Sequence, residues 1–483
     1  MVETRANLVA GAWVTDGGDG YRDDINPSDT QDVVAKIPAM AADQAASAIR
    51  AAVESARGWR DTSSVIRGDI LRKAGGLLRE RSAEVADVLR REAGKPRADA
   101  LGEVLKSAEF LEYYGGLGRG AIGEVLPDAR PGVVAQTRYE PLGVVVAITP
   151  WNDPLLTPAR KLGPALVTGN TVVLKPASYT PIVSQELARA LSDAGLPAGV
   201  VNTVTGDSDV VGPVLVDNPD VHAVTFTGST AVGKGLRQRL AGSSIRLQTE
   251  MGGKNAVFVM PDADLAAAAT TIVAAAFGGV GQRCTAASRL IIHEDVYADL
   301  LEAIFGAMAN IHVGPTSEAE TTHGPLISAS QLSTVLSAID RARDQGGRVL
   351  RGGDHLVSSP LDQGFFVDPA VIEVRPDSGL WRDEVFGPVL AVTKVKTLDA
   401  AIDIVNDSSY GLSAGIFTTD LAASHIFADR VNTGQVAVNL PTSGWDAHLP
   451  FGGFKDSGSL FKEQGAEGLR FYTRVKTVAM RVV

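Results

Sequence analysis

The chain has 483 residues, more than one hydrophobic core usually supports, so two or three domains are expected. Its 45% hydrophobic and 21% charged residues are typical of a globular protein. The formal net charge of −11 argues against nucleic-acid binding, because non-specific binding to nucleic acid needs a basic field.

The ends and the cysteine content point to a cytoplasmic protein. The first residues, MVETRANLVAGAWV, show no positive region followed by an apolar one, which argues against a signal peptide. One cysteine cannot form an intrachain disulfide, which fits a reducing compartment. Seven scattered histidines show no metal-ligand spacing, so no metal is expected. The Ala-rich stretch Leu265–Gly281 resembles a membrane span, but its threonines and glycines favour a buried core helix, and no membrane partner is expected.

Residues 41–116 follow a helical pattern, with Ala, Leu and Val at three-to-four spacing and charges between them. Gly94-Lys95-Pro96 interrupts this pattern and predicts the end of a helix. Beyond Gly143 the pattern changes to short β-branched runs, each followed by a helix-like segment. The strands predicted in this first series are Val144–Ile148, Thr171–Leu174, Val200–Val204 and Ala223–Phe226, with helices from near Pro154 and over Pro181–Ala194.

A second alternating series runs from Asn255 to about Val438, and alternation of this kind indicates an α/β protein with parallel, doubly wound sheets. Two further segments, Gly132–Tyr139 and Thr477–Val483, look like β extensions. Such arms usually pair with another subunit, so a homo-oligomer is expected. The strands predicted in the second series are Ala256–Val259, Leu290–His293, Arg348–Leu350 and Leu390–Val395.

A glycine-rich turn follows the strand at Ala223–Phe226. Gly228 to Lys234 match the first seven positions of a phosphate-binding P-loop, with the second glycine at Gly233. The eighth position should be Ser or Thr to hold Mg²⁺, and here it is Gly235, which argues against an ATPase. Free N–H groups at a helix start favour a pyrophosphate. A dinucleotide site and a turn without a ligand both remain consistent with this segment.

Two side chains are candidates for covalent and acid–base chemistry. Cys284 lies in a polar turn, GQRCT, beside Arg283, whose charge favours a thiolate. The alternative is a small core residue. Glu250 precedes a glycine pair at the junction of the two strand–helix series. A carboxylate there is either a general base or a salt-bridge partner.

Eight motifs follow one another along the chain: TPWNDP from Thr149, GNTVVLKPA from Gly169, FTGST from Phe226, EMGGKN from Glu250, GQRC from Gly281, EVFGP from Glu384, Asn406 to Gly411, and PFGGFK from Pro450. Taken in order, they resemble the NAD(P)-dependent aldehyde dehydrogenase superfamily, and the resemblance covers nearly the whole chain. Eight chemically distinct matches in one order make coincidence negligible. They argue against Cys284 as a mere core residue and against Glu250 as a mere salt-bridge partner.

The resemblance implies three catalytic side chains. The Cys284 thiolate adds to the aldehyde carbonyl, and the Asn152 amide and the Cys284 N–H hold the oxyanion. Losing one such donor typically costs ~10²–10³ in rate. Hydride passes to the nicotinamide and leaves a thioester, and Glu250 activates the water that releases the acid. The residue types fit these tasks, since a thiolate adds and leaves readily and a carboxamide donates without titrating.

The resemblance also implies the residues that bind NAD(P)⁺. Lys175 reaches the adenosine ribose, Trp151 and Ser229 lie beside the pyrophosphate, and Glu384 binds the nicotinamide ribose. The other predicted cofactor residues are Phe386, Thr149, Gly228, Gly233 and Gly253.

Three parts of the chain are implied as well. They are an NAD(P)-binding domain over 1–119 and 142–251, a catalytic domain over 252–455, and a bridging oligomerisation region over 120–141 and 456–483. Homodimers or homotetramers are the family norm, and a small aldehyde is the expected partner.

One departure from the family concerns the cofactor. Three residues after Lys175, many NAD⁺-preferring members have a Glu that grips both ribose hydroxyls, and this chain has Ser178. Without the carboxylate a 2′-phosphate is not repelled, and the hydroxyl can donate to it, so NADP⁺ becomes acceptable or preferred. The alternative is that Ser178 is a neutral variant and NAD⁺ still dominates.

A second departure concerns the substrate. After Asn152 the family usually has an aromatic residue, and this chain has Asp153. Asp153, Thr157 and Arg160 follow at spacings of four and three, which predicts one polar helix face along the family's aldehyde tunnel. Arg160 stands where succinate-semialdehyde dehydrogenases place an arginine for the substrate carboxylate, and Arg283 is a second candidate. Alternatively, Asp153 and Arg160 neutralise each other.

The C-terminal stretches 454–465 and 471–477 look closest in pattern to 2-oxoglutarate semialdehyde (2,5-dioxopentanoate) dehydrogenases. Trp445 and Phe451 fall where the family places aromatics around the aldehyde, and Ser443 is close by. The sequence therefore favours a carboxylate-bearing semialdehyde. An amino-aldehyde and an aromatic or aliphatic aldehyde remain alternatives. A CoA-acylating enzyme usually lacks the Glu base, so Glu250 disfavours it. A non-catalytic structural member would have no need for Cys284, Asn152 and Glu250 together.

Overall fold

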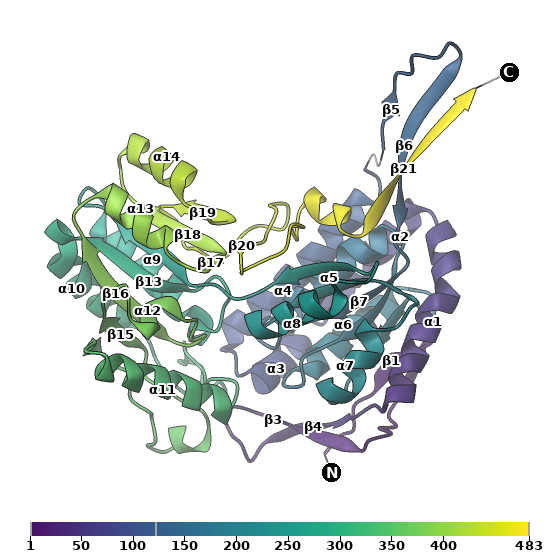
Figure 1. Ribbon diagram of the computed structural model, residues 1–483. Helices are drawn as coiled ribbons and strands as arrows, with labels where there is room; N and C mark the ends of the chain where they lie inside the picture. Colours follow the sequence, from purple (N-terminus) through teal and green to yellow (C-terminus); the bar gives the residue numbers. More distant parts are fainter. Residues whose placement is uncertain (1, 121–122, 482–483) are drawn as a thin grey trace.

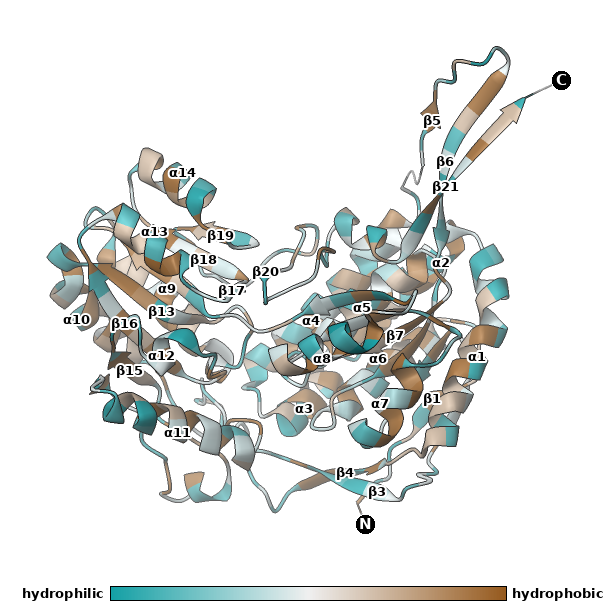
Figure 2. Cartoon of the chain, viewed as in Figure 1, coloured by the Kyte–Doolittle hydropathy of each residue, from teal (hydrophilic) through white to brown (hydrophobic). Residues whose placement is uncertain are grey.

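The computed structural model describes residues 2–120 and 123–481. They form two α/β lobes side by side and a β arm that projects from one of them (Figure 1). In each lobe most strands are apolar and the outer helix faces carry most of the polar residues (Figure 2). This arrangement confirms the predicted fold class, an α/β protein of parallel, doubly wound sheets.

The first lobe contains a five-stranded sheet in the order β11-β10-β7-β8-β9, and every neighbouring pair is parallel. The chain leaves β7 toward β8 and β9 and returns on the other side to β10, so the switch of strand order lies between β7 and β10. Ligands of open α/β sheets bind at the carboxyl ends of the strands at such a switch. The strands are β7 (Val144–Ile148), β8 (Thr171–Lys175), β9 (Val201–Thr203), β10 (Val221–Thr227) and β11 (Arg246–Glu250).

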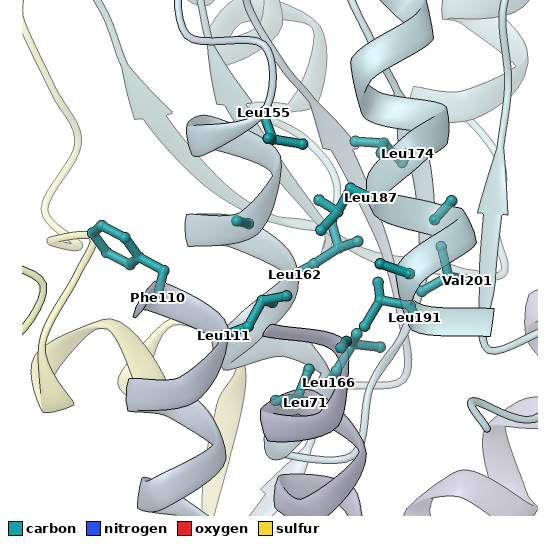
Figure 3. Close-up of a cluster of buried hydrophobic side chains, with 14 of the residues drawn as sticks. Leu71, Phe110, Leu111, Leu155, Leu162, Leu166, Leu174, Leu187, Leu191 and Val201 are labelled. Atoms are coloured by element: carbon teal, nitrogen blue, oxygen red, sulfur yellow. The ribbon is translucent and has the colours of Figure 1, made fainter. Parts of the chain in front are cut away.

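Helices cover both faces of this sheet. Gly94 adopts a left-handed conformation with φ 64° after α3, which confirms the helix stop predicted at this point. The buried helix α5 packs through Leu162 and Leu166 against Leu111 of α4 and Leu187 of α6 (Figure 3). This packing fixes the helix that carries Thr157 and Arg160. The helices are α1 (Ala42–Asp61), α2 (Ser64–Glu80), α3 (Ser82–Ala93), α4 (Arg97–Leu117), α5 (Leu156–Val167), α6 (Pro181–Asp193), α7 (Ser208–Val216) and α8 (Thr230–Leu240).

The second lobe contains a seven-stranded sheet in the order β14-β15-β16-β13-β12-β18-β19, parallel except for the edge pair β14 and β15. Its strands are β12 (Asn255–Val259), β13 (Ala287–His293), β14 (Arg348–Arg351), β15 (Ala370–Glu373), β16 (Val389–Val395), β18 (Ser413–Phe417) and β19 (Gln435–Val438). Its helices are α9 (Leu265–Phe277), α10 (Tyr297–Met308), α11 (Ala329–Asp344), α12 (Gly379–Arg382), α13 (Leu398–Asn406) and α14 (Leu421–Arg430).

The Ala-rich segment forms α9, which packs on this sheet through Ala268, Ile272 and Ala276, as the core-helix interpretation predicts. Among the helices of the described ranges, none is long and apolar enough to cross a membrane.

The arm is a three-stranded antiparallel sheet of β5 (Val125–Leu126), β6 (Val133–Pro141) and β21 (Thr473–Arg481). β21 runs along the whole of β6, from Thr473 opposite Pro141 to Arg481 opposite Val133. The two β extensions predicted from the sequence therefore pair with each other. Val482 and Val483 of the predicted C-terminal strand, and residues 121–122 of the predicted bridging region, lie outside the described residues.

The N-terminal residues form two ribbons, β1 (Asn7–Val9) with β2 (Ala12–Val14) and β3 (Tyr21–Ile25) with β4 (Val33–Pro38). The two sheets of the lobes are joined at residues 251–254. β11 ends at Glu250 on the carboxyl edge of the first sheet, and β12 begins at Asn255 on the amino edge of the second. Cys284 lies three residues before β13, whose amino end is next to that of β12. The connection thus brings the two candidate catalytic side chains to one seam.

Candidate active site

The loop before Cys284 is tightly turned. Gly279, Val280 and Gly281 all adopt positive φ angles of 61°, 59° and 64°. Val280 is unusual here, because a β-branched side chain rarely adopts this conformation. A Cβ on Gly281 would collide with the backbone carbonyl of Gly387. The loop therefore needs its glycines, and it ends α9 so that Cys284 stands half-buried at the seam.

The charge state of the Cys284 thiol follows from its surroundings. Burial raises its pKa to about 12, and the nearby charge of Arg160 opposes this rise. Asp153 and Glu250 raise the pKa further. The resting residue is therefore a neutral thiol. The sequence suggested that Arg283 favours the thiolate, but the cation with the largest effect is Arg160, and Arg283 lies 3.7 Å from Asp99.

Asn152 lies in the turn after β7, almost fully buried. Trp151 and Asn152 line the same small cavity as Gln282 and Arg283, the two residues before the cysteine. The structure therefore brings the predicted oxyanion donor and the nucleophile loop together.

Glu250 is buried, with 2% of its surface exposed, and its carboxyl group faces Gly452, where a Cβ would collide with it. Among residues 2–120 and 123–481, neither of its oxygens has a hydrogen-bond partner. Burial and the charge of Glu463 raise its pKa well above the ordinary value, against the cations Lys161, Lys462 and Arg160. A carboxylate without partners and with a raised pKa is a stronger base than an ordinary one, which suits it to take a proton from water.

A buried ion cluster that sequence reasoning missed lies beside Glu250. Glu463 pairs with Arg160, Nε to Oε2 at 2.9 Å, and also with Lys161, which donates to Thr225 at 2.8 Å as well. Burial opposes ionisation of Glu463, but the charges of Lys161 and Arg160 hold its pKa below the ordinary value. One signal was available: Arg160-Lys161 stands inside an otherwise apolar helix, and buried cations require a carboxylate.

The pairing of Asp153 with Arg160, which the sequence left open as the alternative to a substrate contact, is not formed. Asp153 pairs with Lys95 at 3.1 Å, and Lys95 also pairs with Glu103, which accepts hydrogen bonds from the backbone N–H groups of Leu155 and Leu156. Although burial opposes it, the charges of Lys95 and Arg283 lower the pKa of Asp153. Asp153 also precedes α5, which begins at Leu156, so only Thr157 and Arg160 lie on the helix itself.

Of the predicted aldehyde-side aromatic residues, Phe451 contacts Arg160. Its guanidinium carbon lies 4.8 Å from the centroid of the Phe451 ring, in the geometry of a cation–π contact. Phe451 and Glu463 exchange two backbone hydrogen bonds, of 2.6 and 2.7 Å. Trp445 donates through Nε1 to the carbonyl of Thr442 at 3.1 Å, and Ser443 is half-buried between them.

Trp151, predicted beside the pyrophosphate, meets Phe386, predicted beside the nicotinamide ribose. The rings of Trp151 and Phe386 contact edge to face, with centroids 5.4 Å apart. Glu384 accepts a hydrogen bond from the Gly253 N–H at 3.0 Å, and a Cβ on Gly252 would collide with its carboxyl group. Burial raises the pKa of Glu384 to about 7, opposed by this N–H and by the charge of Lys254. The glycine pair therefore makes room for the Glu384 carboxyl group, and Gly253 binds one of its oxygens.

The phosphate and adenosine end fits a dinucleotide as well. Ser229 is the N-cap of α8, whose first turn presents free N–H groups, and Gly228 packs so tightly on Phe226 that a Cβ would lie 2.6 Å from its ring. Gly233 packs as closely on Met251, while Lys234 points away and pairs with Asp456 at 2.8 Å. Thr149 Oγ1 is buried and has no protein partner within the described part of the chain.

A cavity of about 360 Å³ at the end of β8 is lined by Ser178, Arg22 and Asp207. Lys175 is buried next to it, and burial lowers its pKa while the charge of Asp207 raises it. Hydroxyls, a lysine and helix N–H groups are the donors that ribose and phosphate require. The residues at the seam thus fit NAD(P)⁺.

The fold and the seam fit one class of enzyme, a dinucleotide-dependent dehydrogenase with a thiol beside the cofactor site. The chain belongs to the aldehyde dehydrogenase family, whose sequence profile matches residues 13–478. It therefore oxidises aldehydes with NAD(P)⁺.

The chain is similar in sequence to two curated enzymes. It is 42% identical to the alpha-ketoglutarate semialdehyde dehydrogenase of Haloferax volcanii over 99% of both chains. It is also 42% identical to the 2,5-dioxopentanoate dehydrogenase of Saccharolobus solfataricus, over 97% of this chain and 98% of that protein.

Solved structures are similar in fold. The NAD-dependent aldehyde dehydrogenase of Sinorhizobium meliloti superposes with a TM-score of 0.96 at 33% identity, covering 99% of this chain and 94% of that one. The NAD⁺ complex of the Bacillus cereus aldehyde dehydrogenase gives a TM-score of 0.95 at 33% identity, covering 100% and 97%.

Proposed function

We propose that the enzyme oxidises a carboxylate-bearing semialdehyde of the 2-oxoglutarate semialdehyde (2,5-dioxopentanoate) type to the corresponding dicarboxylic acid. The observation that carries this proposal is the buried guanidinium of Arg160 on α5, which lies 4.8 Å from the Phe451 ring centroid and whose charge acts on the Cys284 thiol. The names of the two relatives at 42% identity support the same substrate class.

We assign the first half-reaction to Cys284 and Asn152. The Cys284 thiol must pass its proton to water before the sulfur adds to the aldehyde carbon, and the positive charge of Arg160 favours that loss. The Asn152 amide and the Cys284 N–H hold the oxygen that becomes negative on addition. When bound, the nicotinamide supplies a hydride acceptor. Loss of the hydride turns the adduct on Cys284 into a thioester.

We assign the second half-reaction to Glu250. Its partner-free carboxylate takes a proton from water, the hydroxide adds to the thioester carbon, and the carbon–sulfur bond breaks to return the thiolate and release the acid. Glu463 keeps Lys161 and Arg160 charged beside it, and these cations lower the pKa of Glu250 from its buried value.

Arg160→Leu tests the substrate class. A charged hydrogen bond to a carboxylate contributes about 1.5–3 kcal/mol, so kcat/KM for succinate semialdehyde and 2,5-dioxopentanoate should fall roughly ten- to hundredfold relative to hexanal. The ratio is the measure, because loss of Arg160 also disturbs Glu463 and Cys284 and slows every aldehyde.

Arg283→Leu is the matched control, since it removes the other arginine near the nucleophile. If Arg160→Leu slows hexanal and semialdehydes equally, Arg160 is a structural partner of Glu463 and the proposal is wrong. A specific loss in Arg283→Leu instead would move the carboxylate to Arg283.

We further propose that NADP⁺ is accepted, because Ser178 lines its cavity together with Arg22 and leaves no carboxylate at the position after the lysine motif. Ser178→Glu should raise the Kd of NADP⁺ at least tenfold through like-charge repulsion with the 2′-phosphate, and change the Kd of NAD⁺ far less. Titration with 2′,5′-ADP and 5′-AMP isolates the same contact, and Ser178→Ala controls for loss of the hydroxyl. Equal effects on both cofactors would place Ser178 away from the 2′ position.

We propose the parts of the chain as follows: residues 1–119 and 142–251 bind the cofactor, residues 252–455 form the catalytic domain, and residues 120–141 and 456–483 form the bridging region.

The arm of β6 and β21 projects from the body and exposes Val134, Val475 and Met480, which supports a homodimer or homotetramer (Figure 1). Light scattering during gel filtration gives the oligomer mass, and a monomer would contradict this proposal. We also propose a reducing compartment such as the cytoplasm, since oxidation of the one thiol would end catalysis.

A further inference from the structure

Asn255, the first residue of β12, lies where the chain enters the second lobe and has 2% of its surface exposed. Its side-chain Nδ2 donates to the carbonyl of Cys284 and to the carbonyl of Ala286, both at 2.8 Å. Its Oδ1 accepts from the N–H of Ser413, the first residue of β18, at 3.1 Å. The whole carboxamide is therefore used to tie the nucleophile turn to the amino ends of two neighbouring strands.

The turn itself is fixed on both sides of Cys284. The carbonyl of Arg283 accepts from the N–H of Ala286 at 3.0 Å, which closes a four-residue turn with Cys284 at its second position. The carbonyl of Thr285 accepts from the Thr442 hydroxyl at 2.7 Å. Asn255 holds the remaining two carbonyls, so every peptide group around the nucleophile has a defined direction.

The rest of the loop cannot supply this order by itself. Residues 279–281 just before the turn all adopt positive φ, including the non-glycine Val280, a conformation that surrounding contacts must maintain. Gly253 shows how close the packing is, because a Cβ there would lie 2.9 Å from the Cys284 carbonyl oxygen and 2.7 Å from Asn255 Oδ1. Without the amide, the carbonyls of Cys284 and Ala286 lose the donor that fixes their directions.

We propose that Asn255 is a positioning residue for the nucleophile. Asn255 holds the carbonyl of Cys284 and so fixes the peptide group that follows the nucleophile, while the Ala286 N–H holds the carbonyl of Arg283 and fixes the peptide group that carries the Cys284 N–H. Together they orient Sγ and the Cys284 N–H toward the same substrate carbonyl group. Only a carboxamide can do this, since it offers two N–H groups and an acceptor, whereas Asp has no donor and Ser has one. Asn255 touches no reacting atom and acts through the backbone.

The test separates orientation from reactivity. Iodoacetamide alkylates Cys284 without an oxyanion donor, so its rate reports on the thiolate and its access, whereas aldehyde turnover also requires correct orientation. Asn255→Ala and Asn255→Asp should lower kcat about a hundredfold, the scale of one lost oxyanion donor. In Asn255→Ala, which adds no charge beside the thiol, the alkylation rate, the KM for aldehyde and the Kd of NAD(P)⁺ should change less than about threefold. Asn255→Ser keeps one donor, should retain intermediate kcat, and carries the test if the other variants do not fold.

Thr442→Val is the matched control, because it removes the other side-chain donor to the same turn, one carbonyl away. It should lower kcat much less than Asn255→Ala. Equal losses in the two variants, accompanied by equal losses in Tm, would mean that Asn255 only stabilises the fold. Parallel losses of alkylation and turnover would mean that it acts on thiol ionisation, and either result overturns the proposal. The inference rests on Cys284 being the nucleophile. If Cys284→Ala were active, Cys284 would not be the nucleophile and the role of Asn255 would fall with it. If Cys284→Ala is inactive but Asn255→Ala behaves like the wild type, only the role of Asn255 is wrong.

Discussion

Cys284→Ala is expected to lower aldehyde oxidation by about 10⁴-fold or more, because removal of a nucleophile leaves only binding and polarisation of the substrate. The Kd of NAD(P)⁺, followed by quenching of protein fluorescence, should stay within about threefold of wild type, since the predicted cofactor contacts come from other side chains. Cys284→Ser keeps the shape of the side chain and should be equally inactive, because a hydroxyl is far less acidic than a thiol.

The wild-type thiol provides a pH-dependent control. With a pKa of about 12, its thiolate fraction rises tenfold for each pH unit between pH 7 and 10. In the enzyme without cofactor, alkylation by iodoacetamide should rise with that slope and show no plateau below pH 10. If Cys284→Ala turned over near the wild-type rate, the assignment of Cys284 as the nucleophile would be wrong. An alkylation plateau near neutral pH would show instead that the thiol is already ionised at rest.

The parts of the site that lie on local motifs could be predicted from the sequence. The strand ends that carry Thr149, Lys175 and Gly228 follow apolar, β-branched runs, and such runs mark buried parallel strands. Gly94 predicted the end of a helix because glycine readily adopts the left-handed conformation found at helix ends. In each case the signal and the structure it specifies lie within a few residues of each other.

Strand β11 shows where local signals fail. Its sequence Arg-Leu-Gln-Thr-Glu is polar, and the second half is buried only because β10 and the C-terminal segment cover it. Gln248 is satisfied there by Thr225 and by the carbonyl of Lys462, and neither contact is visible in the strand's own sequence. The strand that carries Glu250 to the seam was therefore not predicted.

The ion pairs were the least predictable part of the site. Spacing on a helix suggested that Asp153 and Arg160 neutralise each other, yet Asp153 lies before the helix and pairs with Lys95. Arg160 pairs with Glu463, about three hundred residues further along the chain. Partner choice among buried charges depends on which elements pack together, so spacing along one helix cannot decide it.

Glu250→Gln is expected to stop the reaction after the first half. Glutamine has nearly the same shape but cannot accept a proton from water, so the thioester on Cys284 should accumulate. Mixing enzyme, NAD(P)⁺ and aldehyde should give a burst of about one NAD(P)H per active site, followed by a steady state slower by roughly 10²–10⁴-fold, the usual contribution of a general base. Mass spectrometry of the quenched protein should show the acyl group on the peptide that contains Cys284.

The burst shows whether Glu250 activates the water that hydrolyses the thioester, or also takes the proton from the Cys284 thiol before the aldehyde is attacked. Because burial keeps Cys284 protonated at rest, a base is also needed before the aldehyde is attacked. Glu250 is without a partner and has a raised pKa, so it is chemically able to perform that step too. If Glu250→Gln forms its first NAD(P)H as slowly as it turns over in the steady state, no burst is seen. Glu250 then also activates the thiol, and the assignment to deacylation alone is wrong.

Glu384→Gln is the matched control, a buried carboxylate on the cofactor side. It should raise the KM for NAD(P)⁺ and leave no acyl group on Cys284 after quenching. Hydroxylamine, which cleaves thioesters without a base, should restore turnover in Glu250→Gln but not in Glu384→Gln.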